Sequence, residues 1–349
     1  MPNVIFDLFT QEDPDGDLVS SLEGVVENIP HKPNRIRQLG LFRYEPLTGT
    51  RVDFDVVMNG TGLAPITARD AATTFVDDAN RNLVDFRAVK ISKSAKIAEE
   101  DIRDVRAILQ ATNDPRIAYE TASAALARRV RIASGFVRNS FELMELSAIR
   151  NKLIDHTGAP LGSGDMYVKM GAVDPGTVYL DIDNLSDGEF NTAISEIVDR
   201  IADALGDLAY TSVHCFVNSK TMARIANMPE NRESFKRQQE SAFLREKKGY
   251  GTTFETAGVT FETYRGKIGG VDFVGEGEMI FFPVGADNFY CGLAPATRLR
   301  SDVGQVEFAL PYEDPRGEFS EVEVQSNPVI ANLRPLSTVI ANIGVDPGV

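Results

Sequence analysis

The sequence has no long apolar run and no secretion signal. No stretch approaches the roughly 18 apolar residues that a membrane-spanning helix needs. The N-terminus, MPNVIFDLFTQEDPDGD, has neither the basic start nor the apolar core of a signal peptide. We therefore expect a chain that does not enter a membrane and that stays in the cytosol.

Cysteine and histidine are scarce and scattered. Cys215 and Cys291 lie far apart without CxxC spacing, so neither a disulfide framework nor a thiolate metal site is indicated, and both are expected to be small buried residues. His31, His156 and His214 form no HExxH pattern. The sequence therefore predicts no metal site, and each histidine is expected to have a structural role.

The common catalytic patterns are also missing. There is no GxSxG elbow, and no glycine-rich loop ends in Lys-Ser or Lys-Thr for phosphate binding. The 249–253 segment (GYGTT) is too short and follows a charged stretch, so it is predicted to be a loop. The acid pairs at 99–100 and 181–183 are of a kind common on solvated surfaces. We predict no catalytic residues, no cofactor and no enzyme activity, so an enzyme is left possible only through residues that sequence alone cannot bring together.

The charge is strongly negative and unevenly spread. The net charge of −15 and the pI near 4.8 argue against a protein that binds DNA by neutralising phosphates. Residues 1–30 hold seven acids and no Lys or Arg, whereas 115–154 hold seven basic residues and three acids. One hypothesis is that this acidic arm lies on a basic surface of a neighbouring copy. The alternative is that the charges are solvated on separate faces.

The feature that organises the chain is one uninterrupted helical pattern. A chain of 349 residues is expected to form two or three lobes. Asn113 and Pro115 predict a helix start, and Gly158 with Pro160 predicts the stop, so the helix should run to about Ile154. About 40 residues give a rod about 60 Å long. Its predicted inner stripe is Ala122, Leu126, Ala133, Val137, Phe141, Met144 and Ala148.

The part before this helix is predicted to be largely extended. Residues 1–37 are broken by proline and glycine and are expected to form an arm. Residues 51–58 and 83–92 alternate apolar and polar side chains, which predicts two strands, and the polar stretch between them is long for a turn. A short helix is expected over 98–109.

The part after Gly158 is predicted to be mixed α/β. Helices are expected over 189–208, with Phe190, Ile194, Ile197, Ile201 and Leu205 inward, and over 220–228. A buried strand is expected over 212–217, followed by an exposed charged segment over 229–250. Further strands are predicted over 166–168, 177–180, 259–264 and 271–274 as a hairpin, 279–284 and 289–293 in a central sheet, and 306–310, 322–325, 329–333 and 339–343.

Three local pieces resemble the lambda-like group of tailed-phage major capsid proteins. The most specific is the tail, with Tyr312, Asp314-Pro315-Arg316, Glu318-Phe319 and Gln325-Ser326-Asn327-Pro328. The other two are Arg128-Arg129-Val130-Arg131 followed by Glu142-Leu143-Met144-Glu145, and the strand and helix over 212–226. The order of these parts is similar to the Hong Kong 97-type capsid fold over nearly the whole chain.

The resemblance implies an α+β fold with five parts. These are an N-terminal arm (1–37), an extended hairpin called the E-loop with flanking strands (38–97), a peripheral domain with a long spine helix (98–157), an axial α/β domain (158–300), and a return to the peripheral domain (301–349). No fused scaffolding domain is visible in the sequence, so a separate scaffolding protein is implied.

The resemblance also implies the function. The chain is expected to be a capsid protein of the virion, assembled in the host cytoplasm as pentamers and hexamers. These tile an icosahedral head around double-stranded DNA without sequence-specific binding. A portal and a decoration or cement protein are further expected partners. Contacts between subunits are expected at the E-loop tip (Ala68, Arg69, Asp70, Thr73, Thr74, Phe75) and at an axial segment (Arg245, Lys247, Lys248).

Two other classes remain open from sequence. An encapsulin-like bacterial compartment shell uses the same fold without a genome, and a neighbouring cargo enzyme with a docking tail would distinguish it. A cytosolic α/β enzyme would be a monomer or small oligomer with a ligand pocket. The polar stretches at 1–37 and 59–82 have no ready explanation in such an enzyme.

Overall fold

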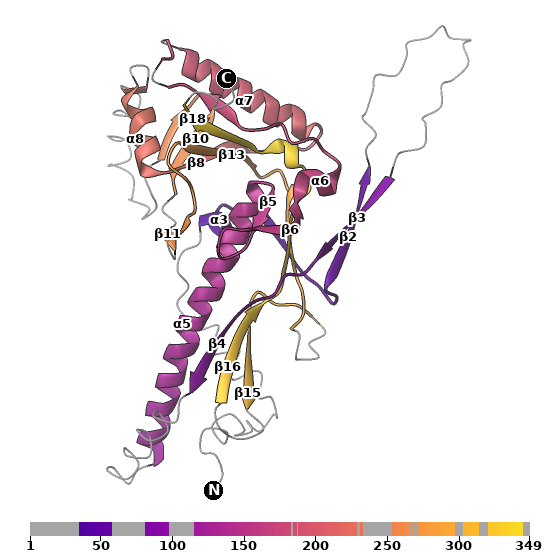
Figure 1. Cartoon of the computed structure of the whole chain (residues 1–349), viewed down its shortest axis with the longest axis vertical. Coiled ribbons are helices and arrows are strands. Elements are labelled where there is room, and N and C mark those ends of the chain that lie inside the picture. The colour runs from indigo at the N-terminus through magenta and orange to yellow at the C-terminus, as the bar shows by residue number, and fades with distance from the viewer. Residues whose placement is uncertain are drawn as a thin grey trace, which may run out of the picture.

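The computed structural model describes most of the chain. The described residues are 35–57, 81–97, 115–182, 184–186, 188–228, 231–232, 253–264, 267–268, 271–296, 303–313 and 320–344. In Figure 1 a single long helix, α5, runs away from an α/β lobe, and a two-stranded hairpin leaves the body on the other side.

The long helix is α5 (Pro115–Ile149), with proline at its first position. Its 35 residues make a rod of about 52 Å. The predicted extension to about Ile154 is wrong, because Asn151 has a φ of +64° and Lys152 already begins a strand. Within the predicted stripe, the described side chains are all buried: Ala133, Val137, Phe141, Met144 and Ala148.

A three-stranded antiparallel sheet lies beside part of α5 (Figure 1). Its strands are β15 (Phe308–Glu313), β16 (Ser320–Ser326) and β4 (Ile91–Ile97), with β16 in the middle. Residues from all of these elements share one apolar cluster: Ala95, Val130, Ala133, Val137, Ala309, Val322 and Val324.

The α/β lobe is built on a six-stranded mixed sheet in the order β7-β18-β13-β8-β10-β9. The strands are β7 (Val178–Leu180), β18 (Val339–Ile343), β13 (Glu278–Val284), β8 (Ser212–Val217), β10 (Val259–Thr263) and β9 (Thr253–Thr256). Adjacent residues of β8 alternate between two cores. Cys215 packs in the cluster that includes the lobe's helices, and Phe216 packs in the cluster that includes the end of α5.

Two helices complete the outer side of this lobe. They are α7 (Glu189–Leu205) and α8 (Ser219–Asn227). The predicted inward stripe of α7 is confirmed, because Phe190, Ile194, Ile197, Ile201 and Leu205 are all buried. The Asn218 side chain caps α8 by accepting a hydrogen bond from the Thr221 amide at 2.8 Å.

A second three-stranded sheet connects the start of the described chain to its later part. Strand β14 (Phe289–Leu293) lies between β1 (Phe42–Pro46), which is parallel to it, and β17 (Pro328–Asn332), which is antiparallel. A short helix, α3 (Arg35–Gln38), precedes β1. Cys291 of β14 and Cys215 of β8 are both buried, as predicted.

The remaining elements are short or project from the body. The hairpin that leaves the body consists of β2 (Arg51–Val57) and β3 (Arg81–Arg87). The others are β5 (Lys152–Ile154) paired with β6 (Pro160–Asp165), β11 (Lys267–Ile268) paired with β12 (Val271–Asp272), α6 (Met166–Met170) and the 3-10 turn η1 (Pro335–Ser337).

Three predicted elements are wrong. Residues 166–168 form the start of α6, because the Asp165 carboxylate caps the amides of Tyr167 and Val168. Strand β10 does not pair with 271–274 but lies between β8 and β9. Residues 289–293 form β14 of the second three-stranded sheet and not part of the central sheet.

The predicted five-part division stays a prediction, and the predicted helix over 98–109 lies outside the described residues. The described chain after residue 301 contributes to three sheets. Strands β15 and β16 lie beside α5, β17 pairs with β14, and β18 pairs with β13 and β7. The last described strand therefore belongs to the α/β lobe.

Candidate functional site

The predicted contact residues lie outside the described part of the chain. This holds for the E-loop tip (Ala68, Arg69, Asp70, Thr73, Thr74 and Phe75) and for the axial segment (Arg245, Lys247 and Lys248). The structure describes the hairpin on which the first set is carried, and the strand β9 that follows the second set. The candidate site is therefore built from the surfaces and joints around these supports.

The hairpin has an apolar side and a charged side. The Phe54 ring packs edge-on against Phe86, with centroids 5.8 Å apart, and against Tyr290 of β14 at 4.9 Å. On the charged side Arg51 lies 2.8 Å from Asp53 and 3.7 Å from Asp85, across the strand pair. Aromatic packing fixes the root of the hairpin to the body, and the exposed ion pairs add little to that.

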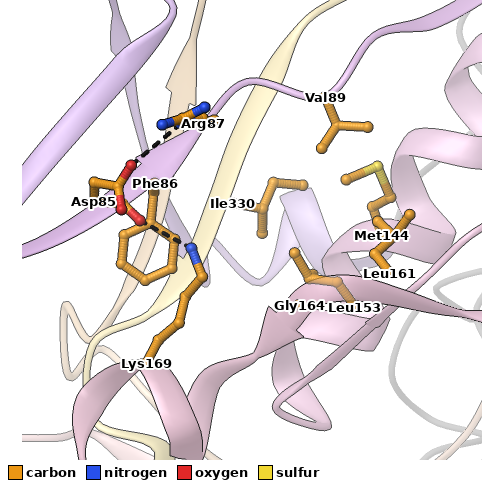
Figure 2. Close-up of a pocket in the computed structure, with 10 residues that line it drawn as sticks. All are labelled: Asp85, Phe86, Arg87, Val89, Met144, Leu153, Leu161, Gly164, Lys169 and Ile330. Atoms are coloured by element: carbon orange, nitrogen blue, oxygen red, sulfur yellow. Dashed lines mark hydrogen bonds and ion pairs between the residues drawn. The ribbon is translucent and has the colours of Figure 1, made fainter.

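A pocket of about 410 Å³ lies at this root. Figure 2 shows Lys169 of α6 reaching toward the hairpin from below, while apolar side chains line the opposite side. The Lys169 amine donates to the Asp85 carbonyl oxygen at 2.8 Å and lies 4.3 Å from the centroid of the Phe86 ring. Burial lowers the pKa of Lys169. The apolar lining includes Val89, Met144, Leu153, Leu161 and Ile330.

A second, open groove of about 560 Å³ continues from this pocket along α5. The two share Val89, Met144 and Leu161. At its far end the groove reaches Phe136 of α5, which is 53% exposed, and Lys93 of β4, whose amine lies 5.2 Å from the centroid of the Phe136 ring. The groove therefore combines an apolar floor with a rim that carries Lys90 and Lys93 together with Asp155 and His156.

Beneath these surfaces, a cluster of buried charges joins α3, β1, α5 and β10. We call it the junction cluster; it consists of Arg35, Arg37, Tyr44, Glu142, Glu145, Glu262 and Tyr264. Glu145 is fully buried, accepts a hydrogen bond from the Tyr44 hydroxyl and lies 3.7 Å from the Arg37 guanidinium. Arg35 binds Glu262 through two nitrogens, at 2.6 and 2.9 Å.

The pKa shifts in the junction cluster follow from burial. Desolvation raises the pKa of Glu142, while the Tyr264 hydroxyl that donates to it and the Arg37 charge lower it. Burial and the nearby carboxylates raise the pKa of Tyr264 and of Tyr44. Both tyrosines therefore remain protonated donors, and the cluster holds the end of α5 against the α/β lobe.

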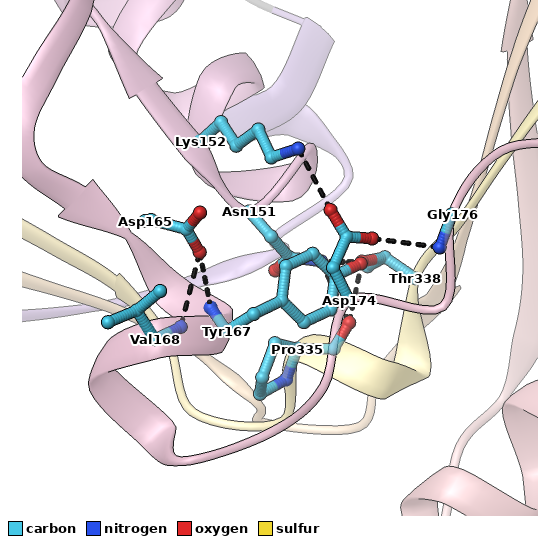
Figure 3. Close-up of polar contacts among 9 residues, drawn as sticks. All are labelled: Asn151, Lys152, Asp165, Tyr167, Val168, Asp174, Gly176, Pro335 and Thr338. Atoms are coloured by element: carbon cyan, nitrogen blue, oxygen red, sulfur yellow. Dashed lines mark hydrogen bonds and ion pairs between the residues drawn. The ribbon is translucent and has the colours of Figure 1, made fainter.

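A second polar joint lies where α5 ends (Figure 3). The Asn151 amide nitrogen lies 2.9 Å from the Tyr167 hydroxyl, 2.8 Å from the Pro335 carbonyl and 2.7 Å from the Thr338 hydroxyl. Its amide oxygen accepts from Asn332 at 2.8 Å. One buried side chain thus connects the end of the long helix to α6, η1 and β17.

Metal-binding clusters and reactive thiols are absent from the described residues. Within the described residues, no group of three or more His, Cys, Asp or Glu side chains is arranged to hold a metal ion. Burial raises the pKa of both thiols, Cys215 and Cys291, so they remain protonated and unreactive. No described helix combines the length and the apolar character that crossing a membrane requires.

The comparison with known proteins agrees with the architecture. The profile of the phage major capsid protein E family matches residues 19–343. The chain belongs to this family. The major capsid protein of Salmonella phage Felix O1 is 24% identical over 275 residues, which is 72% of this chain and 70% of that protein.

A solved structure shares the fold. It is the candidate capsid protein of an E. coli CFT073 prophage, which is 9% identical, with a TM-score of 0.56 over 93% of this chain and 99% of that one. The predicted α+β fold of the Hong Kong 97 type is thereby confirmed, and so is the predicted resemblance to phage major capsid proteins.

Sequence reasoning missed the groove and both polar joints. The junction cluster left one signal, since Glu142 and Glu145 flank the buried stripe positions Phe141 and Met144. An acid beside a core position indicates a buried partner. The partners themselves lie 101 and 122 residues away in sequence, so no local pattern identifies them.

Proposed function

We propose that copies of this chain form the pentamers and hexamers of an icosahedral phage head around double-stranded DNA. The observation that carries this proposal is the match of the capsid family over 19–343 together with a hairpin that projects from a lobed body. A projecting hairpin adds contact area to a neighbour without enlarging the subunit core. Many modest contacts then give a stable closed shell.

The hairpin supports a specific contact. Its root is fixed by Phe54 and Phe86 against the body, so whatever its tip touches is mechanically joined to the core. We propose that the tip residues Ala68, Arg69, Asp70, Thr73, Thr74 and Phe75 lie on an adjacent subunit. The acidic net charge of −15 suits a shell whose lining must release DNA.

Other partners follow from the same proposal. A separate scaffolding protein sets the curvature during assembly in the host cytoplasm, a portal occupies one vertex, and a decoration or cement protein is a further partner. The role is structural and not enzymatic. No observation of the described residues favours a compartment shell or a cytosolic enzyme over a phage head.

The test is assembly. The chain is expressed alone and with the product of the adjacent candidate scaffolding gene, and particle size is measured by sedimentation and electron microscopy. Closed shells or rings of five and six are expected. A stable monomer or dimer in both preparations, across salt and crowding conditions, would remove the capsid proposal.

The axial segment has its own test. We propose that Arg245, Lys247 and Lys248 contact neighbours within a capsomer. Arg245→Glu with Lys247→Glu should then reduce capsomers strongly without unfolding the monomer. The control is Lys220→Glu, a reversal at a side chain that is 72% exposed on α8. Normal shells from the double variant would refute this contact.

A further inference from the structure

One face of α5 exposes large apolar side chains. We call it the α5 face; it consists of Arg128, Arg131, Ile132 and Phe136, with Lys93 of β4 beside them. Ile132 is 54% exposed and Phe136 is 53% exposed, and they lie one helical turn apart. The opposite stripe of the same helix is buried, so these two residues are not part of the subunit core. Two adjacent exposed apolar side chains beside an open groove make this face a candidate binding surface.

The charged members of the α5 face are all basic. Arg128 and Arg131 are exposed, and the Lys93 amine lies 5.2 Å from the centroid of the Phe136 ring. The sequence has no Asp or Glu between Glu120 and Glu142. A partner for this face therefore needs apolar side chains together with negative charge.

The face continues into the open groove. Phe136 belongs to both, and the groove extends past Leu143 toward Phe273. Its volume of about 560 Å³ accommodates several side chains of an extended segment. A ligand on the α5 face can therefore bury apolar side chains in the groove while its acids meet the basic residues of the α5 face.

The chain itself contains a segment with this composition. Residues 1–30 hold seven acids and no Lys or Arg, and Val4, Ile5, Phe6, Leu8 and Phe9 surround Asp7 near the start. The described chain begins at Arg35, so 34 residues precede it. Extended, they reach up to about 110 Å, about twice the length of α5. Reach therefore does not limit docking on a second copy.

We propose that residues 4–9 of one copy dock on the α5 face and groove of a neighbouring copy. The inference rests on the proposed function, because a contact between copies gains its use in a shell. Burying four or five large side chains in trans adds to the contact made by the hairpin, and the surrounding acids pair with Arg128, Arg131 and Lys93. The opposite charges also steer the arm to this face rather than to acidic surfaces.

The test is disulfide trapping between two variants. Phe6→Cys in one chain and Phe136→Cys in a second, tagged chain are coexpressed with the scaffolding protein, and particles are oxidised mildly. The native thiols do not compete, because Cys215 and Cys291 are both 0% exposed. The control replaces Phe136→Cys by Val173→Cys, a side chain that is 85% exposed elsewhere on the surface. A disulfide-linked heterodimer at least about tenfold above the control is expected.

A charge swap provides a second reading. Arg131→Glu should lower the trapping yield several-fold, and Asp7→Lys in the other chain should restore part of it. Shells without a heterodimer above control would overturn the docking and leave the proposed function standing. A further preparation places Phe6→Cys and Phe136→Cys in the same chain, and a disulfide that forms only within that chain would also overturn the docking. Absence of shells in every preparation would instead remove the proposed function, and trapping in the soluble oligomers would still decide the docking.

Discussion

At the scale of single residues, the most consequential side chains are the buried acids of the junction cluster. Glu145 is 0% exposed and has Arg37 and Tyr44 as partners. Glu145→Ala would leave the Arg37 guanidinium next to the Phe141 ring, 4.6 Å from its centroid, without its carboxylate. Removing one partner of a buried ion pair costs about 3 to 5 kcal/mol.

We therefore expect Glu145→Ala to lower the free energy of unfolding by that amount, measured by urea unfolding of the unassembled chain. The matched control is Lys220→Ala, which breaks an ion pair whose side chains are 72% and 66% exposed. The control should cost less than about 1 kcal/mol. Equal losses in the two variants would mean that burial does not strengthen the Glu145 contacts.

Glu142 gives a prediction about pH. Its pKa in the folded chain is raised above the ordinary value of 4.5, mainly by burial. The folded state therefore binds its proton more tightly than the unfolded state. The stability that folding gains from the protonated Glu142 side chain is therefore fully present below about pH 4.5, and it is lost as the pH rises through the pKa of the folded state.

Glu142→Gln removes this charge. The variant should melt a few degrees above the parent at pH 7, and the difference should shrink as the pH falls toward 4.5. Tyr264→Phe is the matched variant, because the Tyr264 hydroxyl bond lowers the pKa of Glu142. Losing this hydrogen bond should raise the pKa of Glu142 further. The stability of Tyr264→Phe should therefore depend more steeply on pH than the stability of the parent. Melting curves between pH 4 and 7 measure both, and a constant Glu142→Gln difference would contradict the assignment.

At the scale of elements, the end of α5 is decided by Asn151. Its φ of +64° lies in the left-handed region, which asparagine tolerates better than most residues. Its side chain also makes the contacts to Tyr167, Pro335, Thr338 and Asn332. Asn151→Ala should lose about 3 kcal/mol, from several hydrogen bonds and the strained backbone.

Asn151→Gly separates the two causes. Glycine adopts a positive φ without strain, so this variant should be about 1 kcal/mol more stable than Asn151→Ala while it still lacks the hydrogen bonds. Urea unfolding of both variants measures the difference. Equal stability of the two would show that the backbone conformation contributes nothing.

The same residue shows what sequence could predict about elements. The helices α5 and α7 were predicted because apolar side chains repeat every three or four positions along them. The end of α5 was not predicted correctly. Asn151 is an ordinary polar residue in the pattern, whereas Gly158 and Pro160 are strong stop signals that lie further along the chain. The helical turn at 166–168 was missed because three residues are too few to show a period.

The pairing of strands was harder still. Individual strands such as β8 and β13 were predicted in place, since runs of apolar β-branched and aromatic residues mark them. Which strand pairs with which depends on contacts distant in sequence. Strand β10 lies parallel to β8 across more than 40 residues of chain, and the sequence around it favours a local hairpin instead. The partners in the junction cluster are also far apart in sequence, so no local pattern predicted their contacts.

At the scale of the whole molecule, the fold divides stability from assembly. The buried cores hold the lobe, α5 and the hairpin root as one subunit, and the remaining exposed apolar side chains stand outside them. In a free monomer these exposed side chains add nothing to the stability of the fold. In a shell they are available for contacts between copies, which is the role that the family implies.

Leu83 tests this division. It lies on β3, where Val84 and Phe86 are buried, but its own side chain is 66% exposed on the projecting hairpin. Leu83→Asp removes no core contact, but it places a second carboxylate opposite Asp55 of β2, so the free energy of unfolding of the monomer should fall by no more than about 1 kcal/mol. If the hairpin contacts a neighbour, a buried unpaired carboxylate there is costly. The yield of shells, measured by sedimentation, should therefore fall at least about tenfold.

Two comparisons make the result decisive. Val84→Asp on the same strand changes a side chain that is 7% exposed and should destabilise the monomer itself. Leu83→Ser shortens the exposed side chain without adding charge and should reduce the shell yield less than Leu83→Asp does. A Leu83→Asp chain that is as stable as the parent and assembles as well would show that this edge of the hairpin faces solvent in the shell. The contact with the neighbour would then have to be made further along the hairpin.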